Sequence, residues 1–122
     1  MQEIYIPFDK QNSVQVEDGY VIDNFLTKNH KTSHSLVCSH LNGKHPMMKN
    51  TVSDRTYYLT KGYATFYINN KQIKIRENEV IFIPKNTLFS FEGEFDAVLV
   101  CVPAFDPKDD VVYNGVFNKS NI

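Results

Sequence analysis

The fold is decided by the stretch RTYYLTKGYATFYINNKQIKIRENEVIFIPKNTLFSF, residues 55–91. It is made of short segments rich in β-branched and aromatic residues, which favour a pleated, half-buried surface. Ala64, Phe66 and Ile68 alternate with more polar residues, and this period of two is typical of a strand. We therefore expect strands at 57–59, 63–68, 72–75, 80–83 and 88–91, arranged as the middle of a small β-barrel.

Turn signals separate these segments. Gly62, Asn69-Asn70 and Asn78 stand where a positive φ angle is needed, and Pro84 to Asn86 adds a fixed φ. Outside the stretch we expect strands at 3–6, 20–25 and 33–41, an irregular segment at 42–54, and a strand at 95–103 that is buried on both sides. Residues 111–117 read as an edge strand or tail, and 118–122 as frayed. No helix longer than a turn is expected.

Composition sets the class of protein. The chain has 122 residues, enough for one domain with a single core, and 42% of them are hydrophobic. A formal net charge of -1 gives no general attraction to nucleic acid. No apolar run approaches the length of a membrane span and no signal peptide opens the chain, so we expect a cytoplasmic protein. Cys38 and Cys101 have the pattern of reduced core thiols.

The spacing in the middle of the chain resembles the cupin superfamily. From Gly43 to Gly62 the intervals match the first cupin motif, with Lys49 and Thr51 at its histidine positions and Arg55 at its glutamate position. The second motif keeps Pro84, has Asn78 and Asn86 in place of glycines, and has Phe89 in place of a histidine. The resemblance covers about residues 35–110. It implies an all-β jelly-roll barrel, with N-terminal strands at 1–34 and a tail at 111–122.

The same resemblance implies that the standard metal site is lost. Metal-dependent cupins use those histidines and the glutamate, whereas Lys and Arg only donate hydrogen bonds and Phe is no ligand. We therefore expect neither a metal nor another cofactor in the barrel. A rival interpretation is a non-standard metal site in which His45 joins His40 and Cys38.

In this register Lys49, Thr51, Arg55 and Phe89 converge at the barrel mouth. Two cations and a hydroxyl beside an aromatic ring suit an anionic or sugar-like ligand. Phe91 shares the face of Phe89 and is expected to stack on that ligand. The alternatives left open are a solvated Lys49, phenylalanines that are plain core, and an Arg55 that pairs with Asp54, Glu79 or Glu92.

The chemistry implied for this site rests on Tyr57 with His40 or His45. Metal-free cupins of nucleotide-sugar pathways use a His or Tyr as acid or base, which suggests a metal-independent isomerase or epimerase with Tyr57 and His45 as catalytic residues. The alternative is a non-catalytic ligand-sensing or dimerisation module. We expect a homodimer, with Tyr63, Tyr67 and Tyr5 as its aromatic surface. The sequence leaves open the identity of the ligand and whether catalysis occurs.

Overall fold

The structure is a computed structural model that describes residues 5–113. These residues form eight strands, joined in part by three one-turn 3-10 helices. The strands are β1 (Ser13–Glu17), β2 (Tyr20–Leu26), β3 (Ser35–Asn50), β4 (Asp54–Ile68), β5 (Lys71–Arg76), β6 (Val80–Ile83), β7 (Phe89–Val102) and β8 (Asp110–Tyr113). The helices are η1 (Lys10–Asn12), η2 (Lys28–His30) and η3 (Pro107–Asp109), and none of them could cross a membrane. The cytoplasmic address stays a prediction.

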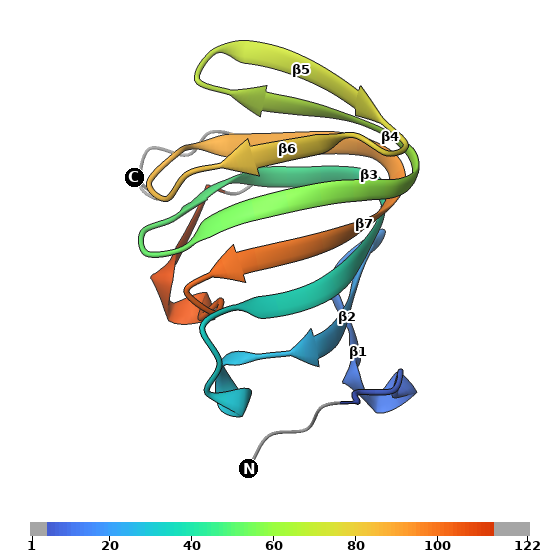
Figure 1. Cartoon of the computed structure of the whole chain (residues 1–122). Coiled ribbons are helices and arrows are strands. Elements are labelled where there is room, and N and C mark those ends of the chain that lie inside the picture. Colours follow the sequence, from blue (N-terminus) through green and yellow to red (C-terminus); the bar gives the residue numbers. More distant parts are fainter. Residues whose placement is uncertain (1–4, 114–122) are drawn as a thin grey trace.

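Three long strands, β3, β4 and β7, hold the barrel together. The order is β1-β2-β3-β7-β4-β5, and β6 and β8 pair with β4 and β3. One half of the long strands pairs with β2 and β6, and the other half pairs with β8 and β5. The two halves form facing layers, and the long strands curve from one layer to the other on the right of Figure 1. The architecture is the all-β jelly-roll barrel that the sequence predicts.

Glycines at the curve explain why the predicted strands are too short. A Cβ at Gly62 would lie 2.0 Å from the carbonyl oxygen of Glu94, and one at Gly93 would lie 2.4 Å from that of Tyr63. The backbones of β4 and β7 therefore approach each other where only glycine fits. The predicted segments 57–59 and 63–68 are one strand, as are 88–91 and 95–103, because these glycines bend a strand without interrupting its pairing.

Other boundaries differ in informative ways. β3 continues to Asn50, through a segment expected to be irregular, because it keeps pairing with β7 and then β8. β1 was not expected at all. Of the predicted strand at 3–6, residues 3 and 4 lie outside the described part, and 5 and 6 are not in a strand. Residues 114–122, with the predicted frayed end and the rest of the edge strand, also lie outside it. Val102 is half exposed, so the 95–103 segment is not buried on both sides.

The core between the layers is largely aromatic. Tyr57, Phe66, Phe89 and Phe91 are each at most 1% exposed. Phe91 is stacked on Phe66 with ring centroids 4.9 Å apart and on Phe89 at 6.1 Å. Burying a side chain of this size contributes about 1.5–3 kcal/mol relative to leaving it exposed, so these rings supply much of the stability of the barrel and fix the positions of the polar groups among them.

On the outer surface His40 links three strands. Its Nδ1 lies 2.7 Å from Asp96 on β7, and its Nε2 lies 2.7 Å from Asp23 on β2. Carboxylates accept hydrogen bonds, so this arrangement favours a proton on each ring nitrogen, which is the imidazolium form of His40. Partial burial lowers its pKa, but the hydrogen bonds and charges of Asp96 and Asp23 outweigh burial and the pKa is raised.

We predict that the stability advantage of the wild type over a His40→Gln variant decreases as pH rises. Because the pKa of His40 is raised in the folded state, its contribution is complete below the unfolded value of about 6.5 and is lost as pH rises through the folded pKa. For a partly exposed ion pair we expect about 0.2–1 kcal/mol. Urea unfolding of both proteins between pH 5.5 and 9 measures the difference in their free energies of unfolding. A difference that stays constant with pH contradicts the prediction.

Candidate small-molecule site in the barrel

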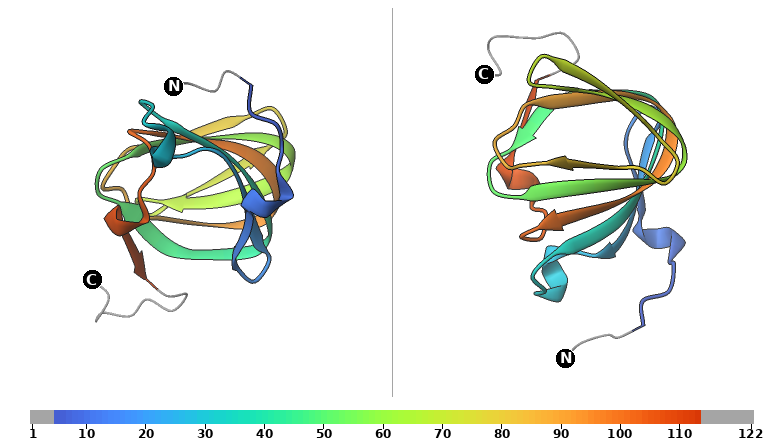
Figure 2. Two further views of the ribbon diagram at one scale, coloured as in Figure 1. Left: turned by 90° about the horizontal axis from the view of Figure 1, so that it is seen from below. Right: turned by 45° about the horizontal axis from the view of Figure 1, so that its top comes forward.

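A cavity of about 380 Å³ lies between the two layers. Seen from below, the β1–β2 hairpin and the segment that leads into β8 stand on opposite sides of the barrel (Figure 2, left). The walls of the cavity are mainly apolar and include Val14, Val16, Ile22, Val37, Met48, Leu99 and Phe105. The polar residues that line it are Tyr20, Asn24, Ser35, His45, Arg55 and Asp110. Apolar walls with a few polar groups are typical of a small-molecule site.

Arg55 is the buried cation of this cavity. It extends from β4, it is 5% exposed, and its Nη1 donates a hydrogen bond of 3.0 Å to the phenol oxygen of Tyr57. Its Nη2 is buried and has no partner among the described residues. Its Cζ lies 5.2 Å from the ring centroid of Phe89 and 5.9 Å from that of Phe105. Aromatic faces stabilise a guanidinium, but they leave the hydrogen-bonding capacity of Nη2 unused.

The charge of Arg55 is permanent. Burial lowers its pKa, but its interactions with Tyr57, Cys101 and the carboxyl of Asp110 outweigh burial, so the net shift is upward. The alternative that Arg55 pairs with Asp54, Glu79 or Glu92 is wrong, because each of these carboxylates has another partner. Their donors are the backbone N–H of Lys85 for Asp54, the backbone N–H of Arg76 for Glu79, and the hydroxyl of Tyr67 for Glu92. Asp110, which also lines the cavity, accepts a hydrogen bond of 2.8 Å from Asn50.

Tyr57 lies beneath Arg55 and does not line the cavity. Its side chain is fully buried, and its oxygen accepts the hydrogen bond from Arg55. Burial raises its pKa by more than the charge of Arg55 lowers it, so Tyr57 stays a neutral phenol. This placement does not test the prediction that Tyr57 is catalytic. Tyr57 is connected to the cavity through its hydrogen bond to Arg55, whose side chain lines the cavity.

His45 supplies a neutral imidazole. Its ring is stacked on Phe91 with centroids 4.6 Å apart, and Tyr20 packs edge-on against it at 5.2 Å. Nδ1 lies 2.8 Å from the carbonyl oxygen of Pro46, which can only accept, so Nδ1 carries the proton and Nε2 has a free lone pair. Burial, with a smaller effect of the Arg55 charge, lowers the pKa of His45 to about 4. At neutral pH the imidazole is therefore unprotonated at Nε2, and this lone pair is the candidate base of the site.

A bulge at Pro46 decides which residues of β3 face inward. The pairing of β3 with β7 shifts between His45 and Met48, so alternation restarts one residue later and Met48 and Asn50 are buried. The prediction that Lys49 and Thr51 join Arg55 in the cavity is therefore wrong. Lys49 pairs with Val111 of β8 outside the cavity lining, and the exposed Thr51 hydrogen-bonds the carbonyl oxygen of Asp109.

His45, next to the bulge, also lines a second cavity. A cavity of about 290 Å³ is lined by His45 and Phe91 together with Lys44, Met47, Tyr67 and Glu92. Phe89 and Phe91, expected to contact a ligand, instead support the two polar groups of the site. Phe89 lies against Arg55, and Phe91 lies against His45.

The structure does not assemble the rival metal site. His40 binds Asp23 and Asp96 on the outer surface, Cys38 alternates with residues of the inner face as His40 does, and His45 lies inside. Within residues 5–113 no group of three or more His, Cys, Asp or Glu side chains is placed to hold a metal ion.

Several residues of the site were missed by sequence analysis. They are Tyr20 and Asp110, which line the cavity, and Glu17, whose carboxylate lies 3.5 Å from His45. None of the three belongs to a sequence motif. The available signal was the turn sequence Glu17-Asp18-Gly19-Tyr20, which places a carboxylate and a phenol beside a tight turn. Nothing in that sequence says that the turn packs against His45.

Comparison with solved structures identifies the class of fold. The chain has the cupin fold, and it resembles the cupin-2 domain protein of Shewanella frigidimarina, with 11% identity, a TM-score of 0.54, and coverage of 57% of this chain and 70% of the other. Neither the protein-family models nor the curated proteins contain a match.

Two enzymes of known activity are more similar in structure. PAC13 of Streptomyces, solved with uridine and described as a nucleoside dehydratase, has 23% identity and a TM-score of 0.74, with coverage of 90% of this chain and 89% of the other. Ectoine synthase of P. lautus has 10% identity and a TM-score of 0.71, with coverage of 84% and 80%. Since these activities differ, the shared fold does not define the reaction of this chain.

We predict that Arg55→Met keeps or increases stability. A buried charge with an unused donor costs free energy, and an apolar side chain of similar length removes that cost. We expect the free energy of unfolding to fall by at most about 1 kcal/mol, and it could rise by as much as about 4 kcal/mol. Chemical denaturation measures it, with the exposed Arg76→Met as the control. A loss of several kcal/mol would show that Arg55 is a structural brace.

Proposed function

We propose that this chain binds an anionic or sugar-like small molecule in the barrel cavity and catalyses its isomerisation or epimerisation without a metal. The observation that carries the proposal is the unused donor of Arg55: its side chain lines the cavity, and its buried Nη2 has no partner among the described residues. A carboxylate, phosphate or carbonyl oxygen of a ligand would accept from it and offset the buried charge.

The second component is the proton acceptor. His45 and Arg55 line the same cavity, and the charge of Arg55 is one of the causes that keep the imidazole neutral. Transfer of a proton from a carbon next to a carbonyl needs a base at that carbon and a cation at the oxygen, where negative charge develops. His45 would serve as the base and Arg55, oriented by Tyr57, would stabilise the oxygen. This division of roles supports an isomerase or epimerase of carbohydrate metabolism.

Uridine is a reasonable first neutral probe, because structures of the similar PAC13 contain it. Glucuronate is the anionic probe, since it combines a sugar ring with a carboxylate, and glucose is its uncharged control. The sizes of these probes suit a cavity of a few hundred Å³.

We predict that Arg55→Met weakens glucuronate binding on the order of 10- to 100-fold, because a hydrogen bond to a charged group contributes about 1.5–3 kcal/mol. Glucose binding should change much less. Isothermal titration calorimetry measures both, and equal affinity of the wild type and the variant for glucuronate argues against the anion site.

Catalysis is tested in the same samples. In deuterated water, NMR follows exchange of the hydrogen on C5 of bound glucuronate, the carbon next to its carboxylate, and we predict that His45→Gln and Tyr57→Phe abolish this exchange while binding persists. Binding without exchange in the wild type would favour the non-catalytic ligand-sensing module.

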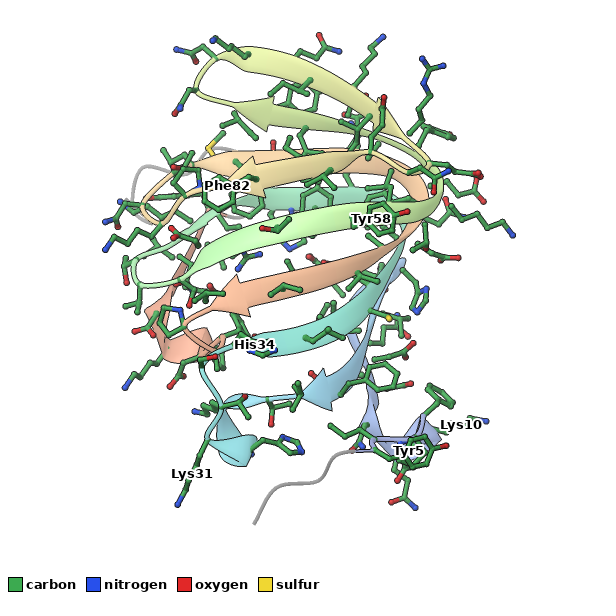
Figure 3. All side chains as sticks on the ribbon, viewed as in Figure 1. Tyr5, Lys10, Lys31, His34, Tyr58 and Phe82 are labelled. Atoms are coloured by element: carbon green, nitrogen blue, oxygen red, sulfur yellow. The ribbon has the colours of Figure 1, made fainter. Side chains whose placement is uncertain are left out.

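We also propose that two copies of the chain pair through the outer face of β4, β6 and β7. Figure 3 shows Tyr58 and Phe82 on neighbouring strands of one face. Tyr58 pairs with Val80 and Val98, and Thr56 pairs with Phe82 and Val100, so the outward positions there carry no charge. Phe82 and Val80 are each 56% exposed. An uncharged apolar face can meet a second copy of itself without like-charge repulsion.

This surface differs from the one that the sequence suggested. Tyr5 lies beside η1 (Figure 3), whereas Tyr63 and Tyr67 lie on the half of β4 that pairs with β5, so the three do not form one face. We predict that Phe82→Asp converts the dimer to a monomer in light scattering and that Tyr63→Asp does not. A dimer that survives the first substitution and is lost with the second would restore the earlier surface.

A further inference from the structure

Glu17 reaches His45 because of an irregularity in β1. Val14 and Val16 line the cavity, so a regular strand would turn Glu17 to the opposite side. The pairing of β1 with β2 shifts between Gln15 and Glu17, as in a β-bulge. Bulges re-aim a side chain, and here Oε1 of Glu17 lies 3.5 Å from Nε2 of His45.

The turn that carries Glu17 is fixed on β3. The backbone N–H of Asn42 donates a hydrogen bond of 2.8 Å to the carbonyl oxygen of Gly19. Gly19 has a φ of 76°, and a Cβ there would lie 2.2 Å from the carbonyl oxygen of Asn42, so only glycine allows this approach. Tyr20, the pairing partner of Glu17, packs edge-on against His45. Two residues of this turn region therefore contact the imidazole.

The two facing atoms are both acceptors. Nε2 of His45 has a lone pair, because Nδ1 holds the proton, and an ionised carboxylate only accepts. Their separation of 3.5 Å is longer than an ordinary hydrogen bond. One proton placed between them would satisfy both atoms.

Burial, reinforced by the nearby charge of Asp18, raises the pKa of Glu17, while burial lowers that of His45 to about 4. A proton on the Glu17 carboxyl, whose pKa is raised, would form an O–H that faces a nitrogen able to accept it. The other titratable or charged groups around the pair are Asp18, Tyr20, Arg55, Lys44 and Glu92.

We propose that Glu17 is a positioning residue that shares with Nε2 of His45 the proton that His45 takes from the substrate. The inference rests on the proposed function. In the step, the bond between carbon and hydrogen breaks, its electron pair stays on the substrate, and the proton binds Nε2. The proton then passes to Oε1 of Glu17, which becomes a carboxylic acid, and the reverse path returns it to the product.

The experiment is an NMR titration of protein labelled with ¹⁵N-histidine and ¹³C-glutamate, and it needs no ligand. In the wild type we expect the Nε2 resonance of His45 to move upfield in step with the titration of the Glu17 carboxyl, before imidazolium forms near pH 4. In Glu17→Gln that first step is lost and the imidazolium step remains. Asp18→Asn, in the same turn, is the matched control and keeps both steps.

A purely structural role for Glu17 would not couple the two curves. Superposable His45 titrations in the wild type and in Glu17→Gln would overturn the inference, whatever the glucuronate and uridine measurements give. Glu17→Asp gives a second measurement, because it keeps the carboxyl but withdraws it from Nε2, and we expect a smaller first step. If the coupling is present and no probe binds, the proposed function fails while the proton-sharing pair stands.

Discussion

A buried guanidinium is the constraint on which the site depends. Arg55 lies among Tyr57, Phe89 and Phe105, and its only hydrogen bond among the described residues goes to a neutral phenol. A charge in such surroundings lowers stability unless a partner arrives. The aromatic core holds the cation in place without neutralising it, and the same charge helps to keep His45 neutral. The chemistry of the cavity follows from these two consequences.

Backbone irregularities complete the site. His45 faces inward by the regular alternation of β3, the bulge after it turns Lys49 and Thr51 outward, and the bulge in β1 brings Glu17 to the same imidazole. Glu17, and Met48 in the cavity wall, therefore come from positions that regular alternation would not select. In a barrel whose long strands are shared by both layers, shifting the alternation is the simplest way to place polar groups beside one another.

These features explain what the sequence could and could not predict. Period-two alternation and the turn residues predicted the all-β barrel, and Asn69, Asn70, Asn78 and Asn86 do have positive φ angles. Arg55 was found because it stands at the glutamate position of the first cupin motif, and His45 because it follows Gly43 of that motif by two residues. Lys49 and Thr51 were misplaced because a one-residue shift reverses every later side chain. Tyr20, Asp110 and Glu17 were missed because their positions arise from contacts between distant segments, which no local pattern encodes.

The sharing of β3, β4 and β7 by both layers also determines how a molecule gets in. Neither layer can move away from the other without breaking strands that run through both, so the body of the barrel does not open. In the described part of the chain β1 pairs with β2 alone, and Val14 and Val16 form one wall of the cavity. An edge strand held on one side separates more readily than a central one. Val14 and Val16 are themselves 46% and 51% exposed, so the cavity meets solvent beside this edge strand, and a substitution there changes the rim of the entrance rather than the body of the barrel.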